Sequence, residues 1–376
     1  MISRRHALSL LSSPLLAGLA APALAAGRVI AAPITLNDKR ILLDVAIGGQ
    51  GPYPFVIDSG GALSLIRESL AQELKLKRVR TIQLNGKSSP IYAAKDVVLG
   101  GALRQPDVMF GGVDGARLGG QGSLASGLLT AGDCELDLDA AQWRLFPDAP
   151  PDRTGYTRLK AELRQESQGA TKRIFADVIL DGEPIEALLD TGWPHALCIS
   201  HEQGVARGLW NDTTPFAPIQ LSNGVTGTAP NPGRLVRVKR LELGPIVLEQ
   251  ALVAIRPEGK RGGGAIAGLP FLRMMNWSLS TEALWVRRNA QAATSNSYGR
   301  SGLWVAEQRG AVRVEVVGAG GPAAKAGVLP GDVIEGGRDL QATIALLDGP
   351  VGQPIALMLK RGGETVRAEF APADYL

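Results

Sequence analysis

The chain has 376 residues, of which 45% are apolar and only 5% aromatic, with 47 glycines and 24 prolines. This length suits two or three domains, and the many turn-forming residues favour short strands, so we expect a mainly β fold. The formal net charge of +4 is small and the basic residues are scattered, which argues against nucleic acid as a partner.

The first 26 residues are typical of a cleaved export signal. Arg4 and Arg5 form a positive start, residues 7–21 are apolar, and residues 23–25 offer the small side chains of a cleavage site. The paired arginines leave both twin-arginine and general secretory export open. No later apolar stretch is long enough to span a membrane. We therefore expect a periplasmic or secreted protein without a membrane span in its mature chain.

An internal repeat organises the middle of the chain. Residues 41–60 and 174–192 both read as an apolar strand, a glycine turn, a second apolar strand and an Asp-Ser/Thr-Gly triplet. The repeat predicts two copies of one β lobe, residues 28–147 and 172–288, joined by a polar linker over 148–171. Further matches follow in the same order: Asn-Gly at 85–86 and 223–224, Leu-Gly at 99–100 and 243–244, and Ser126–Leu129 with Ala267–Pro270.

The two triplets are the candidate chemical site. Glycine permits a tight turn, and the hydroxyl residue can hold that turn by local hydrogen bonds. One triplet alone is only a turn signal, but two at equivalent points of a repeat predict that Asp58 and Asp190 face each other. Two carboxylates that close share a proton, which gives one site a general base and a general acid around a water. The triplets are Asp58-Ser59-Gly60 and Asp190-Thr191-Gly192.

The triplets within Val56–Gly60 and Leu188–Gly192, with the apolar segments around Gly127 and Gly268, resemble the retropepsin-like aspartic peptidases. The resemblance covers most of residues 35–288. It implies a pseudo-twofold pair of β-barrel lobes, each supplying one catalytic aspartate, and no metal or cofactor. It further implies supporting roles in the catalytic loops for Ser59, Gly60, Thr191 and Gly192.

Members of this family close flaps over their substrate, and the candidates here are the hairpins at Asn85-Gly86 and Asn223-Gly224. Gly61 and Trp193 follow the two triplets, and neither can donate a hydroxyl hydrogen bond to an aspartate. We therefore expect raised carboxyl pKa values and activity extending toward mildly acidic or near-neutral pH. Trp193 either lines a substrate pocket or marks a lobe that has drifted from catalysis.

The cysteines and histidines are too few for metal chemistry. An oxidising compartment would permit a bridge between Cys134 and Cys198, while their apolar, strand-like surroundings suit buried thiols; both alternatives stay open. Together with His195 and His201 they make no convincing zinc site. A serine mechanism is disfavoured because the chain lacks a Gly-x-Ser-x-Gly motif and a suitably placed histidine base.

Residues 301–376 depart from the repeat and follow a second linker at 289–300. The run GPAAKAGVLPGDVI resembles the bacterial type of PDZ domain, a small α+β module. The resemblance implies peptide binding by strand addition, with a carboxylate held by backbone amides near Gly302, Leu303 and Trp304. The alternative is that this module serves only as packing or as a lid.

Together these features predict an exported aspartic endopeptidase that acts on peptides or unfolded protein and carries a PDZ-like peptide-binding module. Two lobes in one chain remove the need for a dimer, so we expect a monomer. The competing interpretation is a secreted peptide-binding protein that keeps the fold but has an inactive pair of aspartates, since a fold alone does not fix chemistry.

Overall fold

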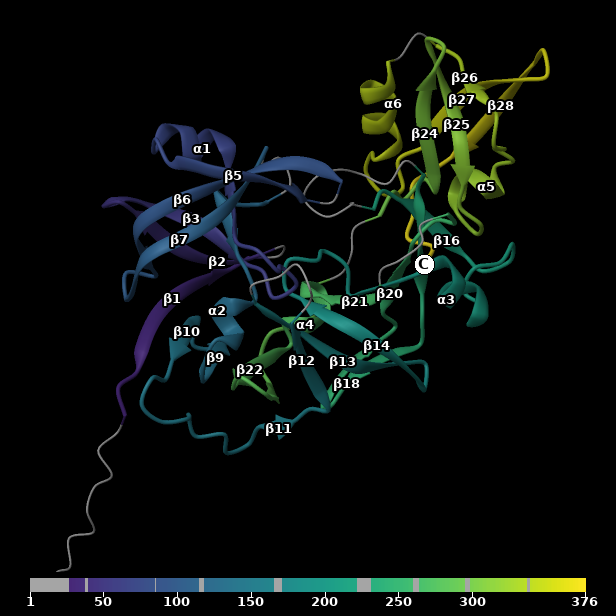
Figure 1. Ribbon diagram of the computed structural model, residues 1–376. Helices are drawn as coiled ribbons and strands as arrows, with labels where there is room; N and C mark the ends of the chain where they lie inside the picture. Colours follow the sequence, from purple (N-terminus) through teal and green to yellow (C-terminus); the bar gives the residue numbers. More distant parts are fainter. Residues whose placement is uncertain are drawn as a thin grey trace, which may run out of the picture.

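The computed structural model describes residues 27–37, 40–84, 86–114, 118–165, 171–221, 231–259, 264–294, 298–336 and 339–376. The protein is mainly β, with 50% strand and 10% helix, which confirms the expected fold class. Figure 1 shows the purple and blue strands of a first lobe, the teal and green strands of a second lobe, and a yellow-green C-terminal unit. Among these residues, no helix is long and apolar enough to cross a membrane. The predicted export signal, residues 1–26, lies outside the described residues.

The first lobe is a closed barrel of six strands. Alternation of apolar and polar residues places one face of each strand inside, as in the strand ILLDVAI, whose alternate apolar side chains are buried. The barrel runs through β2 (Ile41–Ile47), β3 (Gln50–Ile57), β8 (Gly122–Leu124), β4 (Leu65–Arg67), β7 (Leu103–Val113) and β6 (Lys87–Leu99), which pairs with β2 again. Three elements extend it: α1 (Glu68–Glu73) after β4, β5 (Lys77–Leu84) beside β6, and α2 (Gly127–Thr130) after β8.

The second lobe repeats this pairing pattern. Its second strand, β14 (Glu183–Asp190), pairs in parallel with β21 (Ala265–Gly268), as β3 does with β8. Its first strand, β13 (Lys172–Leu180), pairs with β18 (Arg240–Leu243), as β2 does with the end of β6. The strands in pairing order are β16 (Phe216–Ile219), β17 (Gly233–Arg237), β20 (Leu252–Ile255), β15 (Leu197–Ile199), β21 (Ala265–Gly268), β14 (Glu183–Asp190), β13 (Lys172–Leu180), β18 (Arg240–Leu243) and β19 (Ile246–Glu249). Helices α3 (His201–Ala206) and α4 (Leu269–Leu272) follow β15 and β21.

The register of the two lobes corrects one of the sequence matches. Ile57 pairs with Leu124, and its counterpart Leu189 pairs with Ala267. Ala267 therefore corresponds to Leu124 and not to Ser126, so Gly268 corresponds to Ala125 rather than to Gly127. The sequence comparison aligned Gly127 with Gly268 because both are followed by leucine in a short apolar segment.

A sheet of six strands joins the lobes. Its central pairing is between β9 of the first lobe and β22 of the second, with Leu136 opposite Trp277. The strands in order are β11 (Thr157–Arg158), β23 (Leu284–Arg288), β22 (Met275–Leu279), β9 (Cys134–Asp137), β10 (Gln142–Leu145) and β1 (Ile30–Leu36). The segment predicted as a polar linker thus contains β11 and also β12 (Ala161–Gln165), which pairs with β13. Cys134 and Cys198 are buried thiols and form no disulfide with each other.

The C-terminal unit, residues 298–376, has a core of its own. Its sheet runs β24 (Leu303–Gln308), β25 (Ala311–Val317), β26 (Val333–Ile334), β27 (Ile355–Arg361) and β28 (Glu364–Phe370), with α5 (Pro322–Lys325) and α6 (Leu340–Leu347). An ion pair of 2.7 Å joins Arg361 to Asp332, whose side chain is only 1% exposed, and the guanidinium lowers the pKa of that carboxyl. Figure 1 shows this unit above β16 of the second lobe.

Candidate active site

Two strands deliver the two aspartates to equivalent places. Asp58 follows β3 and donates its amide to Leu124 O at 2.9 Å, while Asp190 ends β14 opposite Gly268. In each lobe a tight turn follows the aspartate. It is closed by a hydrogen bond of 3.1 Å from the amide of the residue after the triplet to the aspartate carbonyl, Gly61 to Asp58 and Trp193 to Asp190. The chain therefore reverses at the same point of both lobes.

Ser59 and Thr191 connect the two loops by reciprocal hydrogen bonds. The Thr191 amide donates to Ser59 Oγ at 2.9 Å, and the Ser59 amide donates to Thr191 Oγ1 at 3.1 Å. Each hydroxyl also donates across the interface, Ser59 to Leu189 O at 2.7 Å and Thr191 to Ile57 O at 2.6 Å. Both side chains are buried. The four bonds obey the pseudo-twofold relation and fix one loop against the other.

The structure brings the two carboxyl groups together. A side-chain hydrogen bond joins Asp58 and Asp190. A Cβ atom at Gly192 would lie 3.0 Å from Asp58 Oδ1 and 3.1 Å from Asp190 Oδ1, so these two oxygens are at most 6.1 Å apart (3.0 + 3.1). A Cβ at Gly60 would lie 2.3 Å from Asp190 Cγ. Both triplet glycines are therefore required to leave room for the carboxyl groups.

Burial raises the pKa values of both carboxyl groups. Burial raises the pKa of Asp58, while hydrogen bonds from Asp190 and from the amides of Gly61 and Gly60 act in the opposite direction. Burial also raises the pKa of Asp190 well above its usual range, and the neighbouring charge of Asp58 raises it further. The Gly192 amide donates to Asp190 Oδ1 at 2.8 Å. The pKa of Asp190 is therefore shifted upward by two causes, burial and the charge of Asp58, while that of Asp58 is raised by burial and lowered by its hydrogen bonds.

Two arginines near the dyad were missed by the sequence analysis. Arg40 and Arg173 each stand one residue before their copy of the repeat, which begins at residue 41 or 174, and the charge of each acts on both aspartates. Arg173 Nη1 also donates to Gly60 O at 3.4 Å, which ties the second lobe to the first triplet. Aligning Ile41 with Ile174 would have placed the two arginines at the same position. That equivalence is the signal that could have found them.

Trp193 is 8% exposed and packs in an apolar cluster of the second lobe. Its ring meets the His195 ring edge-on at 6.2 Å between centroids. Within the described part of the chain, the buried atoms Trp193 Nε1 and His195 Nδ1 have no hydrogen-bond partner, and burial lowers the pKa of His195 to about 4. The indole therefore fills space next to the Asp190 loop, where the first lobe has only Gly61.

The other predicted site residues are spread over the molecule. Gly86 lies in the turn between β5 and β6 with a positive φ of 77°, whereas Asn85, Asn223 and Gly224 lie outside the described residues. Gly302 directly precedes β24 and Leu303 begins it, far along the chain from the dyad. Their amides donate to Gly299 O at 3.1 Å and to Ser301 Oγ at 3.3 Å.

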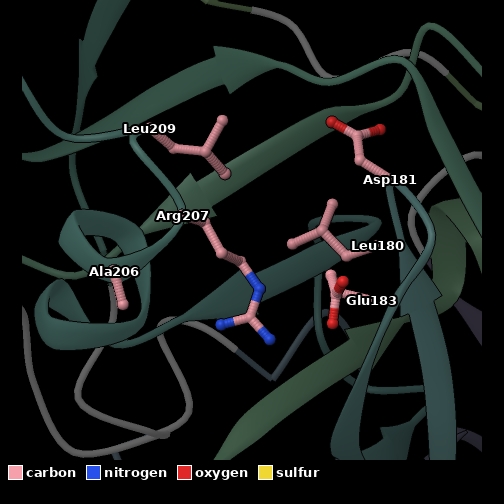
Figure 2. A pocket seen from close by; sticks show the side chains of 6 residues that line it. All are labelled: Leu180, Asp181, Glu183, Ala206, Arg207 and Leu209. Carbon is pink, nitrogen blue, oxygen red and sulfur yellow. The ribbon is translucent and has the colours of Figure 1, made fainter.

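A surface cavity of about 480 Å³ lies in the second lobe, away from the triplets. Figure 2 shows that Arg207, Asp181 and Glu183 line it together with three apolar side chains. Neither triplet contributes to it. No group of residues suited to hold a metal ion is present among the described residues.

Neither a protein-family model nor a curated protein matches this sequence. Solved structures that resemble it include a retropepsin-like aspartic protease from Rickettsia conorii, with 10% identity, a TM-score of 0.27, and coverage of 35% of this chain and 95% of that one. Another is edgp, with 8% identity, a TM-score of 0.39, and coverage of 70% and 95%. A third is the HtrA-type protease AlgW with a decapeptide, with 13% identity, a TM-score of 0.18, and coverage of 76% and 80%. These TM-scores are low, so the site geometry carries the functional proposal.

Proposed function

We propose that this protein is an aspartic endopeptidase whose catalytic residues are Asp58 and Asp190. One observation carries the proposal: two buried carboxyl groups share a hydrogen bond at the meeting point of two pseudo-symmetric loops. Burying two carboxyl groups side by side destabilises a fold. Such a pair is a feature of functional sites, where perturbed pKa values concentrate.

The geometry supports hydrolysis by an activated water. Ionised Asp58 accepts a proton from a water held between the carboxyl groups, and the water oxygen attacks the peptide carbonyl carbon. Protonated Asp190 gives its hydrogen to the developing oxyanion. When the tetrahedral intermediate collapses, the carbon–nitrogen bond breaks and the proton on Asp58 passes to the leaving nitrogen. Asp190 recovers its proton from the hydroxyl, so the pair returns to its starting state.

The substrate and setting extend this proposal. We propose unfolded protein or peptides as substrates, an exported location set by residues 1–26, and a monomeric state. The C-terminal unit is proposed to be a PDZ-like module that binds peptides along the free edge of β24, next to α6. What supports this is that β24 is an edge strand of its sheet, which can accept an added strand.

Two matched variants test the catalytic assignment. In the chain from residue 27 onward, we expect Asp58→Asn and Asp190→Asn each to abolish cleavage of an unfolded protein, because neither variant can hold the shared proton. Asp44→Asn is the control, since Asp44 is an exposed aspartate on β2, and it should cleave at the wild-type rate. Tight binding of peptides by a wild-type protein that never cleaves them would instead support a peptide-binding protein with an inactive dyad.

A further inference from the structure

The C-terminal unit is hydrogen-bonded to the backbone of one strand of the second lobe. The Phe216 amide on β16 donates to Ala319 O at 3.2 Å, and Phe216 O accepts from Tyr375 Oη at 3.1 Å. Gly318 permits this approach, because a Cβ there would lie 2.2 Å from Phe216 O. Both backbone hydrogen-bonding groups of this residue are therefore satisfied by the C-terminal unit.

Residues at the end of the described chain make further hydrogen bonds at this contact. Tyr298 Oη accepts from the amides of Tyr375 and Leu376 at 3.2 and 3.3 Å, and the two tyrosine rings meet edge-on at 5.5 Å. Arg237 on β17 donates to Leu376 O at 2.6 Å. We call this set the clasp; it comprises Phe216, Arg237, Tyr298, Gly318, Ala319, Tyr375 and Leu376.

A single row of paired residues leads from the clasp to the dyad. It crosses six neighbouring strands, β16, β17, β20, β15, β21 and β14, and its members are Phe216, Val236, Val253, Leu197, Ala267 and Leu189. All six side chains belong to one buried core. At about 4.8 Å between strands, the row spans roughly 24 Å. It ends at Leu189, which directly precedes Asp190.

The opposite face of the same strands carries a second connection. Trp193, beside the dyad, belongs to an apolar cluster against which Tyr298, Tyr375 and Leu376 also pack. The clasp thus meets the Asp190 loop through both faces of one sheet. Among the described residues, the hydrogen bonds between the C-terminal part of the clasp and the lobes go to β16 and β17 of the second lobe.

We propose that the clasp is a positioning device: the C-terminal unit holds β16 and thereby keeps the Asp190 loop in its hydrogen-bonded geometry. This inference deepens the proposed function, because it assigns the alignment of one catalytic carboxyl group to a separate unit. Its primary test needs no turnover. Its failure can therefore be told apart from failure of the peptidase assignment.

The test is amide hydrogen exchange in the complete protein, comparing wild type with Tyr375→Phe and Gly318→Ala. Tyr375→Phe removes one hydrogen bond and keeps the ring, so we expect exchange of the Trp193 and Gly268 amides to rise about threefold to tenfold. Gly318→Ala forces the C-terminal unit away from β16 and should raise the exchange rates of these two amides further. Tyr156→Phe, at a tyrosine outside the clasp, should leave exchange unchanged.

The first lobe supplies an internal control. The amides of Gly61 and Ser126, which donate to Asp58 O at 3.1 Å and Gly61 O at 3.0 Å, should exchange at the wild-type rate in both variants. Faster exchange confined to Phe216, or equal changes in both lobes, would overturn the inference. In an active protein we also expect lower kcat/KM with an unchanged pH profile, since neither substitution touches the carboxyl groups.

Discussion

At the scale of single residues, the site is a balance between burial and compensating polar contacts. Ser59 and Thr191 satisfy each other's amides across the lobe interface, so neither can be replaced without leaving a buried donor unsatisfied, at a cost of about 1–3 kcal/mol. The same loops hold two carboxyl groups whose pKa values burial raises. The charges nearest to the dyad then decide the pH range in which it is singly protonated.

The pH dependence of kcat/KM should therefore respond to Arg40 and Arg173. In the proposed mechanism the dyad is active while Asp58 is ionised and Asp190 protonated, so loss of activity at low pH would report the first group and loss at high pH the second. Because burial raises both pKa values, we expect the optimum to lie above the ordinary aspartate pKa of about 3.9. The positive charge of each arginine lowers both pKa values. Arg40→Gln and Arg173→Gln should consequently shift both the low-pH and the high-pH limb of the activity profile to higher pH.

The measurement is a pH–rate profile for each variant, with Arg104→Gln as the control. Arg104 pairs with Asp96 on the surface of the first lobe, and its side chain is 71% exposed, so its removal should leave both limbs in place. An optimum near pH 2, or limbs that move to lower pH in the dyad-proximal variants, would contradict this account of the site.

At the scale of elements, sequence periodicity and the repeat were enough to predict the mainly β fold, and the repeat led to the paired triplets. They could not predict the register of β8 and β21, because Ala125 and Gly268 occupy the same position with different residues. Nor could they find the clasp. Its hydrogen bonds join residues 77 to 159 positions apart, and no local pattern marks them.

The corrected register makes a prediction that separates the two lobes. A Cβ at Gly268 would lie 2.3 Å from His195 O and 2.5 Å from Trp193 O, both of them backbone atoms. Gly268→Ala should therefore destabilise the second lobe by about 1–3 kcal/mol through overpacking and lower activity by displacing the Asp190 loop. Ala125→Gly, at the equivalent place in the first lobe, removes only one methyl group and should cost about 1 kcal/mol or less.

Denaturant unfolding with activity assays on both variants checks this asymmetry. Gly127→Ala is a useful third variant, because a Cβ there meets only the Thr171 side chain, at 2.5 Å, which can move. Equal effects at Gly268 and Gly127 would support the register that the sequence comparison suggested and contradict the one described above.

At the scale of the whole molecule, packing between the lobes keeps the two carboxyl groups buried side by side, although their burial itself destabilises the fold. The sheet joining the lobes, with Trp143 and Trp277 fully buried, keeps the two triplets in contact. The cost of that contact is a pair of buried carboxyl groups. Functional sites commonly reduce stability in this way, and here the loss should depend on pH.

The sign of that dependence follows from the direction of the pKa shift. A carboxyl group whose pKa is raised on folding keeps its proton in the native state while the unfolded chain, with an aspartate pKa of about 3.9, releases it. The unfolded state is therefore stabilised relative to the native state as pH rises. Asp190, whose pKa burial raises well above the usual range, should therefore lower wild-type stability progressively from about pH 4 toward the native pKa. Below pH 4 both states hold the proton and the loss disappears.

Asp190→Asn removes this titration while keeping nearly the same shape, so its stability relative to wild type should increase as pH rises above about 4 toward the native pKa of Asp190. Denaturant unfolding followed by tryptophan fluorescence measures the difference, because Trp143 and Trp277 report on the sheet between the lobes. The same comparison for Asp44→Asn, at an exposed carboxyl group, should show no such trend. A difference for Asp190→Asn that is flat across this range, or that shrinks as pH rises, would mean that folding does not raise the pKa of Asp190, and the shared-proton mechanism would lose its physical basis.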